Sequence, residues 1–186
     1  MKNTQLFVIA AIAAAATFQT AAKAEDPISP VQGAVCSLYL LDETGDLKKN
    51  DEIASTLLSK PAAATVVDLA SDFKCSKKKE GITSNWGMWT GWLRQPTAGT
   101  YTFTCFGDKN QNGYRRYSIW INGVKHASSV VGQFSFNVDL DAGFNSFKLV
   151  AQGYEGNPVS ISYKKALSVK DPVSFGPCDM FYDDEE

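Results

Sequence analysis

The stretch that decides the fold runs from Trp86 to Val124 and reads W-G-M-W-T-G-W-L-R-Q-P-T-A-G-T-Y-T-F-T-C-F-G-D-K-N-Q-N-G-Y-R-R-Y-S-I-W-I-N-G-V. Residues 100–105 alternate threonine with aromatic or cysteine side chains, and residues 117–121 alternate again. An apolar period of two is typical of a strand that buries one of its faces. Asn122-Gly123 then predicts a type I′ hairpin turn, because both residue types tolerate a positive φ. The stretch therefore predicts antiparallel sheet.

Short apolar runs of the same kind recur along the chain, with turn residues about every ten positions. They cover residues 34–41, 65–69, 86–94, 134–140, 147–151 and 159–163. This spacing predicts a β-sandwich or jelly roll rather than an α/β fold. Asp46 to Lys60 is the one helical pattern, with Ile53 and Leu57 at helical spacing and Pro61 after its end. We expect a mainly β domain with one short N-terminal helix.

Residues 1–24 have the composition of a secretory signal peptide. A basic start precedes an apolar run over 6–18 that is too short to span a bilayer, and Ala22-Lys23-Ala24 is a small-x-small cleavage site. We therefore expect export to the periplasm or the cell exterior, without stable membrane insertion. The mature chain is expected to be a single β-sandwich domain over 25–175 with an acidic C-terminal tail over 176–186.

The charge balance and the cysteines narrow the class of protein further. Lys and Arg number 18 against 20 Asp and Glu, a formal net charge of −2, which argues against a nucleic-acid partner.

Four cysteines in an exported chain predict two disulfides, and the C-x-x-C spacing of metal or redox sites is absent. Three pairings are possible. From their order along the chain we favour Cys36–Cys178, which would join the first strand to the chain end, and Cys75–Cys105.

Several motifs resemble the protective-antigen-type β-sandwich module. They are W-T-G-W-L at 89–93, P-x-x-G-T-Y-T-F at 96–103, I-W-I-N-G at 119–123 and V-D-L-D-A-G-F-N-S-F-K-L at 138–149. Anthrax protective antigen, yeast flocculins and adhesins, and several bacterial glycosidases share this module. The resemblance spans roughly residues 86–163 and implies an exported, non-catalytic carbohydrate-binding protein of the lectin or adhesin type.

The polar loop over 108–113 reads D-K-N-Q-N-G, which opens like an oxygen-rich calcium loop. The acid that an EF-hand needs at position twelve is an isoleucine here, so the loop is not an EF-hand. In the adhesins that the chain resembles, a pair of adjacent aspartates holds calcium that bridges to sugar hydroxyls, whereas Lys109 follows the aspartate in this sequence. Calcium held by Asp108, Asn110 and Asn112 and a metal-free Asx-rich turn both remain open. No other cofactor is expected.

Aromatic side chains would supply the second half of a sugar site, because the C–H face of a pyranose stacks on Trp or Tyr. Trp120 should point away from the layer that Ile119 and Ile121 bury. We predict that it serves as the stacking platform, the alternative being that the helix or another strand covers it. Trp92 we expect in the core, as is usual for tryptophan in a sandwich. The predicted ligand-binding residues are Asp108, Asn110, Asn112, Tyr114, Arg115 and Trp120.

Catalysis finds little support in the sequence. His126 is the only histidine, no G-x-S-x-G motif accompanies it, and we expect it at the surface. The alternative function is a structural or protein-interaction subunit of the cell envelope or surface, contacting a protein partner through strand edges or the acidic tail. A glycoside hydrolase ranks third, because it needs two carboxylates on opposite sides of a sugar. Nothing in the sequence pairs Asp108, Asp139, Asp141 or Glu155.

Overall fold

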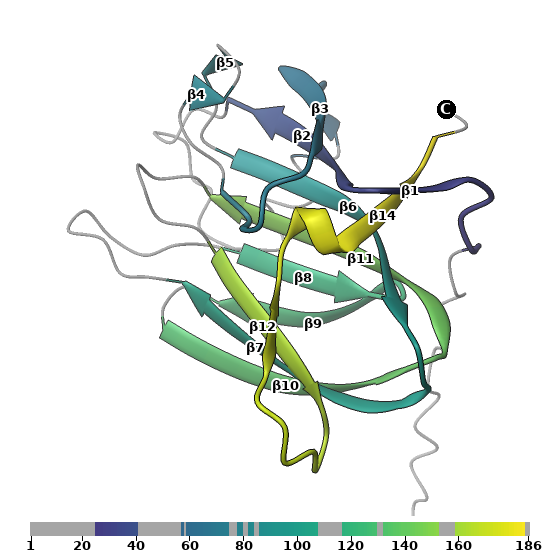
Figure 1. Cartoon of the computed structure of the whole chain (residues 1–186). Helices are drawn as coiled ribbons and strands as arrows, with labels where there is room; N and C mark the ends of the chain where they lie inside the picture. Colours follow the sequence, from purple (N-terminus) through teal and green to yellow (C-terminus); the bar gives the residue numbers. More distant parts are fainter. Residues whose placement is uncertain are drawn as a thin grey trace, which may run out of the picture.

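The computed structural model describes residues 25–40, 57, 59–74, 78–79, 82–83, 86–107, 117–129, 132–152 and 159–184. They form two main sheets, A and B, that lie in two layers (Figure 1). Sheet A has eight strands: β1 (Pro30–Gln32), β2 (Ala34–Tyr39), β3 (Ala64–Asp68), β6 (Trp86–Gln95), β8 (Tyr117–Ile121), β9 (Val124–Ser129), β11 (Gly143–Gln152) and β14 (Met180–Asp183). Sheet B has four: β7 (Gly99–Gly107), β10 (Gly132–Leu140), β12 (Val159–Lys165) and β13 (Val173–Phe175).

Two smaller elements complete the described chain. Strands β4 (Lys78–Lys79) and β5 (Ile82–Thr83) pair with each other, and η1 (Pro177–Asp179) is a short 3₁₀ helix. All described strand pairings are antiparallel. The prediction of a mainly β, antiparallel fold is therefore confirmed.

Strand β6 is the centre of sheet A because both of its edges are hydrogen-bonded. One edge pairs with β11 over its whole length. The other edge is shared, with β2 on the first half of β6 and β14 on the second half. Gly91 lies where these two neighbours meet, and a Cβ there would stand 2.5 Å from the carbonyl oxygen of Phe181. Only glycine fits this junction without displacing backbone.

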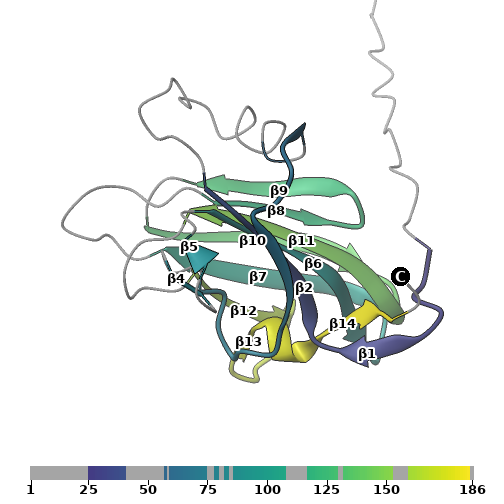
Figure 2. The ribbon, with the colours of Figure 1, turned by 90° about the horizontal axis from the view of Figure 1, so that it is seen from above.

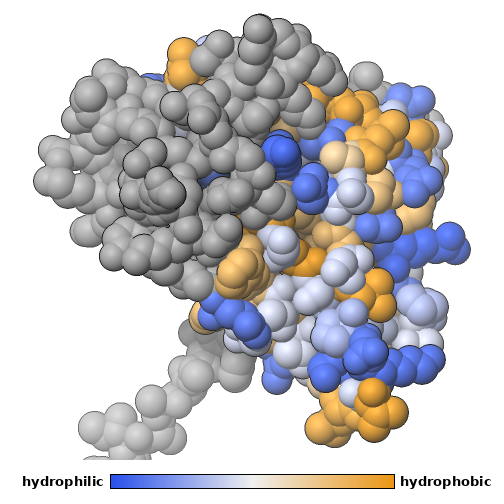
Figure 3. Space-filling view, turned by 60° about the vertical axis from the view of Figure 1, so that its left-hand side comes forward, coloured by the Kyte–Doolittle hydropathy of each residue, from blue (hydrophilic) through white to orange (hydrophobic). Residues whose placement is uncertain are grey.

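The core lies between the two sheets and is built from the inward side of each strand. Along β7, Tyr101, Phe103 and Cys105 are buried, as the alternation predicts. Phe73 forms an isolated bridge with β12, and its ring contacts Trp89 at 5.7 Å and Phe175 at 5.5 Å between centroids. On the face that Figure 3 shows, polar and apolar residues of the described chain are interspersed.

The turn after β8 has the conformation that its sequence predicts. Asn122 has φ 49° and Gly123 has φ 75°, the two positive values of a type I′ turn. This turn leads directly into β9, which is register-paired with β8. The β8–β9 hairpin therefore follows from Asn122-Gly123, although the composition of residues 124–129 did not predict a strand.

The two ends of the described chain lie side by side, because β1 pairs with β14 (Figures 1 and 2). The segment 176–186, which we expected to be an acidic tail, contributes a strand of sheet A up to Asp183. Met180 is fully buried and opposes Leu93 of β6, so this apolar residue draws the segment into the sheet. The chain ends are joined by strand pairing.

Neither predicted disulfide is formed, and this part of the fold prediction is wrong. Cys105 and Cys178 both carry free thiols, and each of the two predicted pairs contains one of them. Cys36 lies buried on β2, whereas Cys178 lies half-exposed on η1. Burial raises the pKa of the Cys105 thiol to about 12, which suppresses the thiolate that disulfide exchange requires. Cys75 is outside the described residues.

Two further expectations fall on parts of the chain that the structure does not describe. Residues 1–24, the expected signal peptide, are among these parts. The helix expected over Asp46–Lys60 also lies outside the described residues, apart from Leu57 and the stretch from Ser59. Leu57 is fully buried against the outer face of sheet A. Within the described part of the chain, no helix is long and apolar enough to cross a membrane.

A buried carboxylate ties β3 to β6. Asp68 is 3% exposed, and its Oδ2 accepts a hydrogen bond of 2.8 Å from the indole N–H of Trp89. Its Oδ1 accepts a second bond of 3.1 Å from the backbone N–H of Ala70. Trp89 is the tryptophan that β6 presents to the core, so the carboxylate satisfies a donor that water cannot reach.

Replacing this carboxylate should destabilise the fold. We expect Asp68→Ala to lower the free energy of unfolding by about 2 kcal/mol, because a buried indole donor is left unsatisfied. Asp68→Asn should cost less, since its carbonyl oxygen can still accept the Trp89 bond. Chemical denaturation of the three proteins measures the difference, and equal stability of Asp68→Ala and wild type would contradict the assignment.

His126 is not the surface residue that the sequence suggested. Its ring stacks on Phe136 with centroids 5.4 Å apart and planes 12° apart, and its Nε2 is buried without a hydrogen-bond partner among the described residues. Burial lowers the pKa of His126 below its ordinary 6.5, and a backbone hydrogen bond to Ile121 opposes this only in part. The folded protein therefore favours the neutral imidazole.

This preference makes stability depend on pH in a defined direction. Below pH 6.5 the unfolded chain takes up a proton at His126 that the folded chain resists, so stability falls as the pH drops from 6.5 toward the lowered pKa. His126→Gln keeps an N–H donor and does not titrate. Urea unfolding at pH 7 and at pH 5 should show a larger loss for wild type than for His126→Gln. The same loss in both proteins would refute this role.

Candidate functional site

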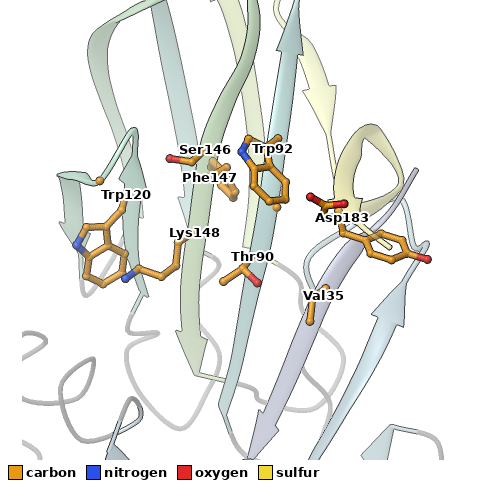
Figure 4. A pocket seen from close by; sticks show the side chains of 11 residues that line it. Val35, Thr90, Trp92, Trp120, Ser146, Phe147, Lys148 and Asp183 are labelled. Atoms are coloured by element: carbon orange, nitrogen blue, oxygen red, sulfur yellow. The ribbon is translucent and has the colours of Figure 1, made fainter. Parts of the chain in front are cut away.

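The outer face of sheet A carries a groove of about 360 Å³. Its walls include two tryptophans, two hydroxyl side chains, an ammonium and a carboxylate: Trp92, Trp120, Thr90, Ser146, Lys148 and Asp183. Figure 4 shows Trp120 and Lys148 on one side of the groove and Asp183 on the other, with Trp92 and Thr90 between them. The volume lies in the roughly 300–1,000 Å³ range of small-ligand sites.

Strand register brings these side chains together. Trp120 of β8 is the register partner of Lys148 on β11, which in turn opposes Thr90 on β6. Two residues away along each strand, Ser146 of β11 opposes Trp92 of β6. Because side chains alternate between faces, residues two apart on one strand share the outer face. One row across β8, β11 and β6 and an adjacent, shorter row across β11 and β6 therefore form the floor of the groove.

Trp120 points away from the core, as its parity predicts. Ile119 and Ile121 are fully buried beneath it, whereas Trp120 is half-buried. It packs against a small apolar cluster on this outer face, formed mainly by Tyr39, Leu57, Trp86 and Val150. Its direction is thus confirmed, while its role as a stacking platform stays a prediction.

Trp92 belongs to the groove and not to the core. Trp89 faces the core from β6, and a residue three positions further along a strand points the opposite way. The indole N–H of Trp92 donates to the carbonyl oxygen of Glu25 at 3.2 Å, which fixes the ring beside the start of the described chain. The expectation that Trp92 lies in the core is therefore wrong, although its spacing from Trp89 indicates the outward direction.

Lys148, which was not among the predicted site residues, also lines the groove. Its Nζ lies 4.4 Å from the centroid of the Trp120 ring, and Nζ of Lys125 lies 5.5 Å from the same ring. Burial lowers the pKa of both lysines. Phe147 and Leu149, which flank Lys148 in the sequence, are both buried. Because side chains alternate between the two faces of a strand, Lys148 must point outward.

Asp183 is held by the chain itself. Its Oδ2 accepts the backbone N–H of Ile28 at 3.0 Å, and its Oδ1 accepts that of Ser29 at 3.1 Å. Both carboxylate oxygens thus anchor the N-terminal segment against β14. Asp183 is the one carboxylate on the described wall of the groove, which lacks the opposed pair that a glycosidase uses.

Five of the predicted site residues fall on a part of the chain that the structure does not describe. Asp108, Asn110, Asn112, Tyr114 and Arg115 all lie outside the described residues, which end at Gly107 and resume at Tyr117. Among the residues that are described, no group of three or more His, Cys, Asp or Glu side chains could hold a metal ion. Of the six predicted ligand-binding residues, Trp120 alone belongs to the described part of the chain, and it lines the groove.

Comparison with solved structures identifies the fold. The PA14 sugar-binding domain from an RTX adhesin is 17% identical, with a TM-score of 0.51 over 77% of this chain and 96% of that domain. The PA14 domain of the antifreeze protein MpAFP is 17% identical, with a TM-score of 0.56 over 86% and 95%. The Epithelial Adhesin 9 A domain from Candida glabrata, in complex with Galb1-4GlcNAc, is 11% identical, with a TM-score of 0.59 over 88% and 95%.

These similarities show that the chain has a PA14-like β-sandwich fold, as its motifs imply. At such identities they show the fold alone. No protein-family model matches the chain, and no curated protein matches its sequence.

A substitution at Lys148 tests whether this lysine serves stability. Lys148→Met keeps an apolar stem over Trp120 and removes a charge that burial disfavours. The lost cation–π contact costs about 0.5–1 kcal/mol at a partly exposed site, and the relief of desolvation opposes it. We expect the midpoint of thermal unfolding, followed by circular dichroism, to stay unchanged or to rise.

Lys164→Met is the matched control, since Lys164 lies on β12 of the opposite sheet. A fall of more than about 3 °C in Lys148→Met, which corresponds to roughly 1 kcal/mol in a domain of this size, would show that Lys148 stabilises the fold.

Proposed function

We propose that this protein is a non-catalytic, lectin-like carbohydrate-binding protein that takes a glycan in the groove on the outer face of sheet A. The observation that carries the proposal is the presence of two half-buried tryptophans, Trp92 and Trp120, on the walls of one groove with hydroxyl and ammonium groups between them. A sugar offers an apolar ring face and a set of hydroxyls, and this groove offers a partner for each. The PA14-like fold supports the proposal, because one protein with a similar structure is a sugar-binding domain of an RTX adhesin and another is an adhesin domain in complex with Galb1-4GlcNAc.

The loop between β7 and β8 enters the proposal from its sequence. Asp108, Asn110, Asn112, Tyr114 and Arg115 are proposed as further ligand contacts. Calcium held by the first three is proposed as an optional cofactor. We also propose that the protein acts after export, in the periplasm or at the cell exterior, from the signal-peptide pattern of residues 1–24.

The test is glycan binding by tryptophan variants. We expect Trp92→Leu and Trp120→Leu each to weaken binding to the best glycan of a broad panel by about fivefold to tenfold, the loss of one stacking contact. Leucine keeps apolar bulk, so the fold should survive, and circular dichroism checks this. Titration calorimetry measures the affinity, and a parallel titration in EDTA tests the calcium of the Asp108 loop.

Phe106→Leu is the matched control, because Phe106 is an exposed aromatic on the opposite sheet. Unchanged affinity in both tryptophan variants would move the site away from the groove. Absence of binding to any glycan would refute the proposed function. Binding that survives EDTA would remove calcium from the mechanism and leave the groove in place.

A protein-interaction role is the second candidate, and one observation favours it. The connection from β12 to β13 exposes Leu167 and Val169 completely, and Val173 is 59% exposed. Apolar side chains gathered at one exposed segment are typical of protein contact sites. A protein-interaction role would be favoured if the protein binds no glycan of the panel.

A further inference from the structure

The groove contains one ammonium and one carboxylate, and the two groups differ in how they are satisfied. Asp183 uses both carboxylate oxygens for backbone N–H groups of the N-terminal segment. Lys148 forms no ion pair with a carboxylate of the described residues, and its ammonium lies over the Trp120 ring. The negative group is therefore part of the scaffold, and the positive group faces the groove.

The surroundings of Lys148 favour an anion. Lys125, the register partner of Trp120 on β9, places a second ammonium near the same ring. Trp120 thus lies between two lysines, Lys125 on β9 and Lys148 on β11. Lys148 is half-buried, so part of the water around its ammonium has already been removed, and this burial lowers its pKa. An anion there meets a partly desolvated cation, and charge-assisted hydrogen bonds are roughly twice as strong as neutral ones.

We propose that the groove recognises a sugar that carries a carboxylate, a hexuronate unit, with Lys148 pairing to that carboxylate. This inference rests on the proposed carbohydrate-binding function and specifies its ligand class. A hexuronate joins the carboxylate to the pyranose ring by a single bond, so a stacked ring carries its charge close to the aromatic platform. The register pair Trp120 and Lys148 supplies the platform and the cation side by side.

The lysine also explains how the platform becomes available. The Lys148 ammonium lies over the Trp120 ring, with its Nζ 4.4 Å from the ring centroid. Its flexible four-carbon stem allows the ammonium to leave the ring and meet the carboxylate as the sugar stacks. Figure 4 shows the indole nitrogen of Trp120 on the side of the ring away from Lys148, so the ring face and not the N–H is what the lysine covers.

The charge of the groove also limits the ligand. Asp183 lies on the opposite wall, and a polysulfated glycan would bring many negative charges against it. The whole chain has a formal net charge of −2, which adds to this repulsion. A ligand with at most one carboxylate on each sugar can pair with Lys148 without bringing many negative charges close to Asp183.

The experiment compares ligands that have the same sugar ring and differ in the charge of the carboxyl group. Trimers of galacturonate, glucuronate and mannuronate are titrated beside their methyl esters, which keep the ring and lose the charge. We expect one of the acids to bind wild type about tenfold more tightly than its ester. Lys148→Gln should reduce this ratio to within about threefold, because the acid loses its ion pair whereas the ester has none to lose. Lys164→Gln, on the opposite sheet, should behave as wild type.

Four results would overturn the inference. Equal binding of acid and ester to wild type would remove the charge preference while keeping the proposed function. An equal loss of both ligands in Lys148→Gln would show that the lysine only shapes the groove. Binding of heparin fragments without binding of the uronates would replace the carboxylate with sulfate. If acids, esters and the neutral glycan panel all fail to bind, the proposed function itself is wrong.

Discussion

The double hydrogen bonding of β6 is the constraint on which the rest of the structure depends. With β11 on one edge and β2 and β14 on the other, β6 cannot shift by a single residue without exposing its buried face. The fixed register sends Trp89 into the core and Trp92 out to solvent. It also aligns Thr90 with Lys148 and, one strand further, with Trp120. The groove is thus a consequence of pairing in the sheet.

Lys148 contributes little to the stability of the fold, which suggests that its role is in binding. A leucine or valine at this outward position would satisfy the apolar neighbourhood without a desolvated charge. The contact with Trp120 returns about 0.5–1 kcal/mol at a partly exposed site, which is comparable to the net worth of one hydrogen bond. Residues that carry such a cost without a clear structural gain are frequent at binding sites. Asp183 contrasts with it, because its two backbone hydrogen bonds give it a structural role.

Much of the fold could be predicted from the alternation of apolar and polar residues along the sequence, whereas much of the site could not. Alternation correctly placed β7, β8 and the outward direction of Trp120, and Asn122-Gly123 correctly predicted a hairpin turn. The outward direction of Trp92 was not predicted because Gly87 and Gly91 interrupt the alternation of β6. Which residues of that strand face the core can be inferred only from Trp89. The cysteine pairs failed because pairing depends on which side of a sheet each thiol occupies, and chain order carries no such information. Strand β14 escaped because a few apolar residues before an acidic end resemble a solvated tail.

The position of the groove bears on how this fold can vary its ligands. Structures with the same fold are only 10% to 20% identical to this chain, so the fold tolerates replacement of most side chains. Core positions are restricted by packing between the sheets, whereas outward positions on β6, β8 and β11 are restricted mainly by solubility. A lysine and two tryptophans can therefore be placed on this face without altering the register that supports them. A face whose shape is set by backbone pairing and whose chemistry is set by freely chosen side chains is a suitable place for a new binding specificity.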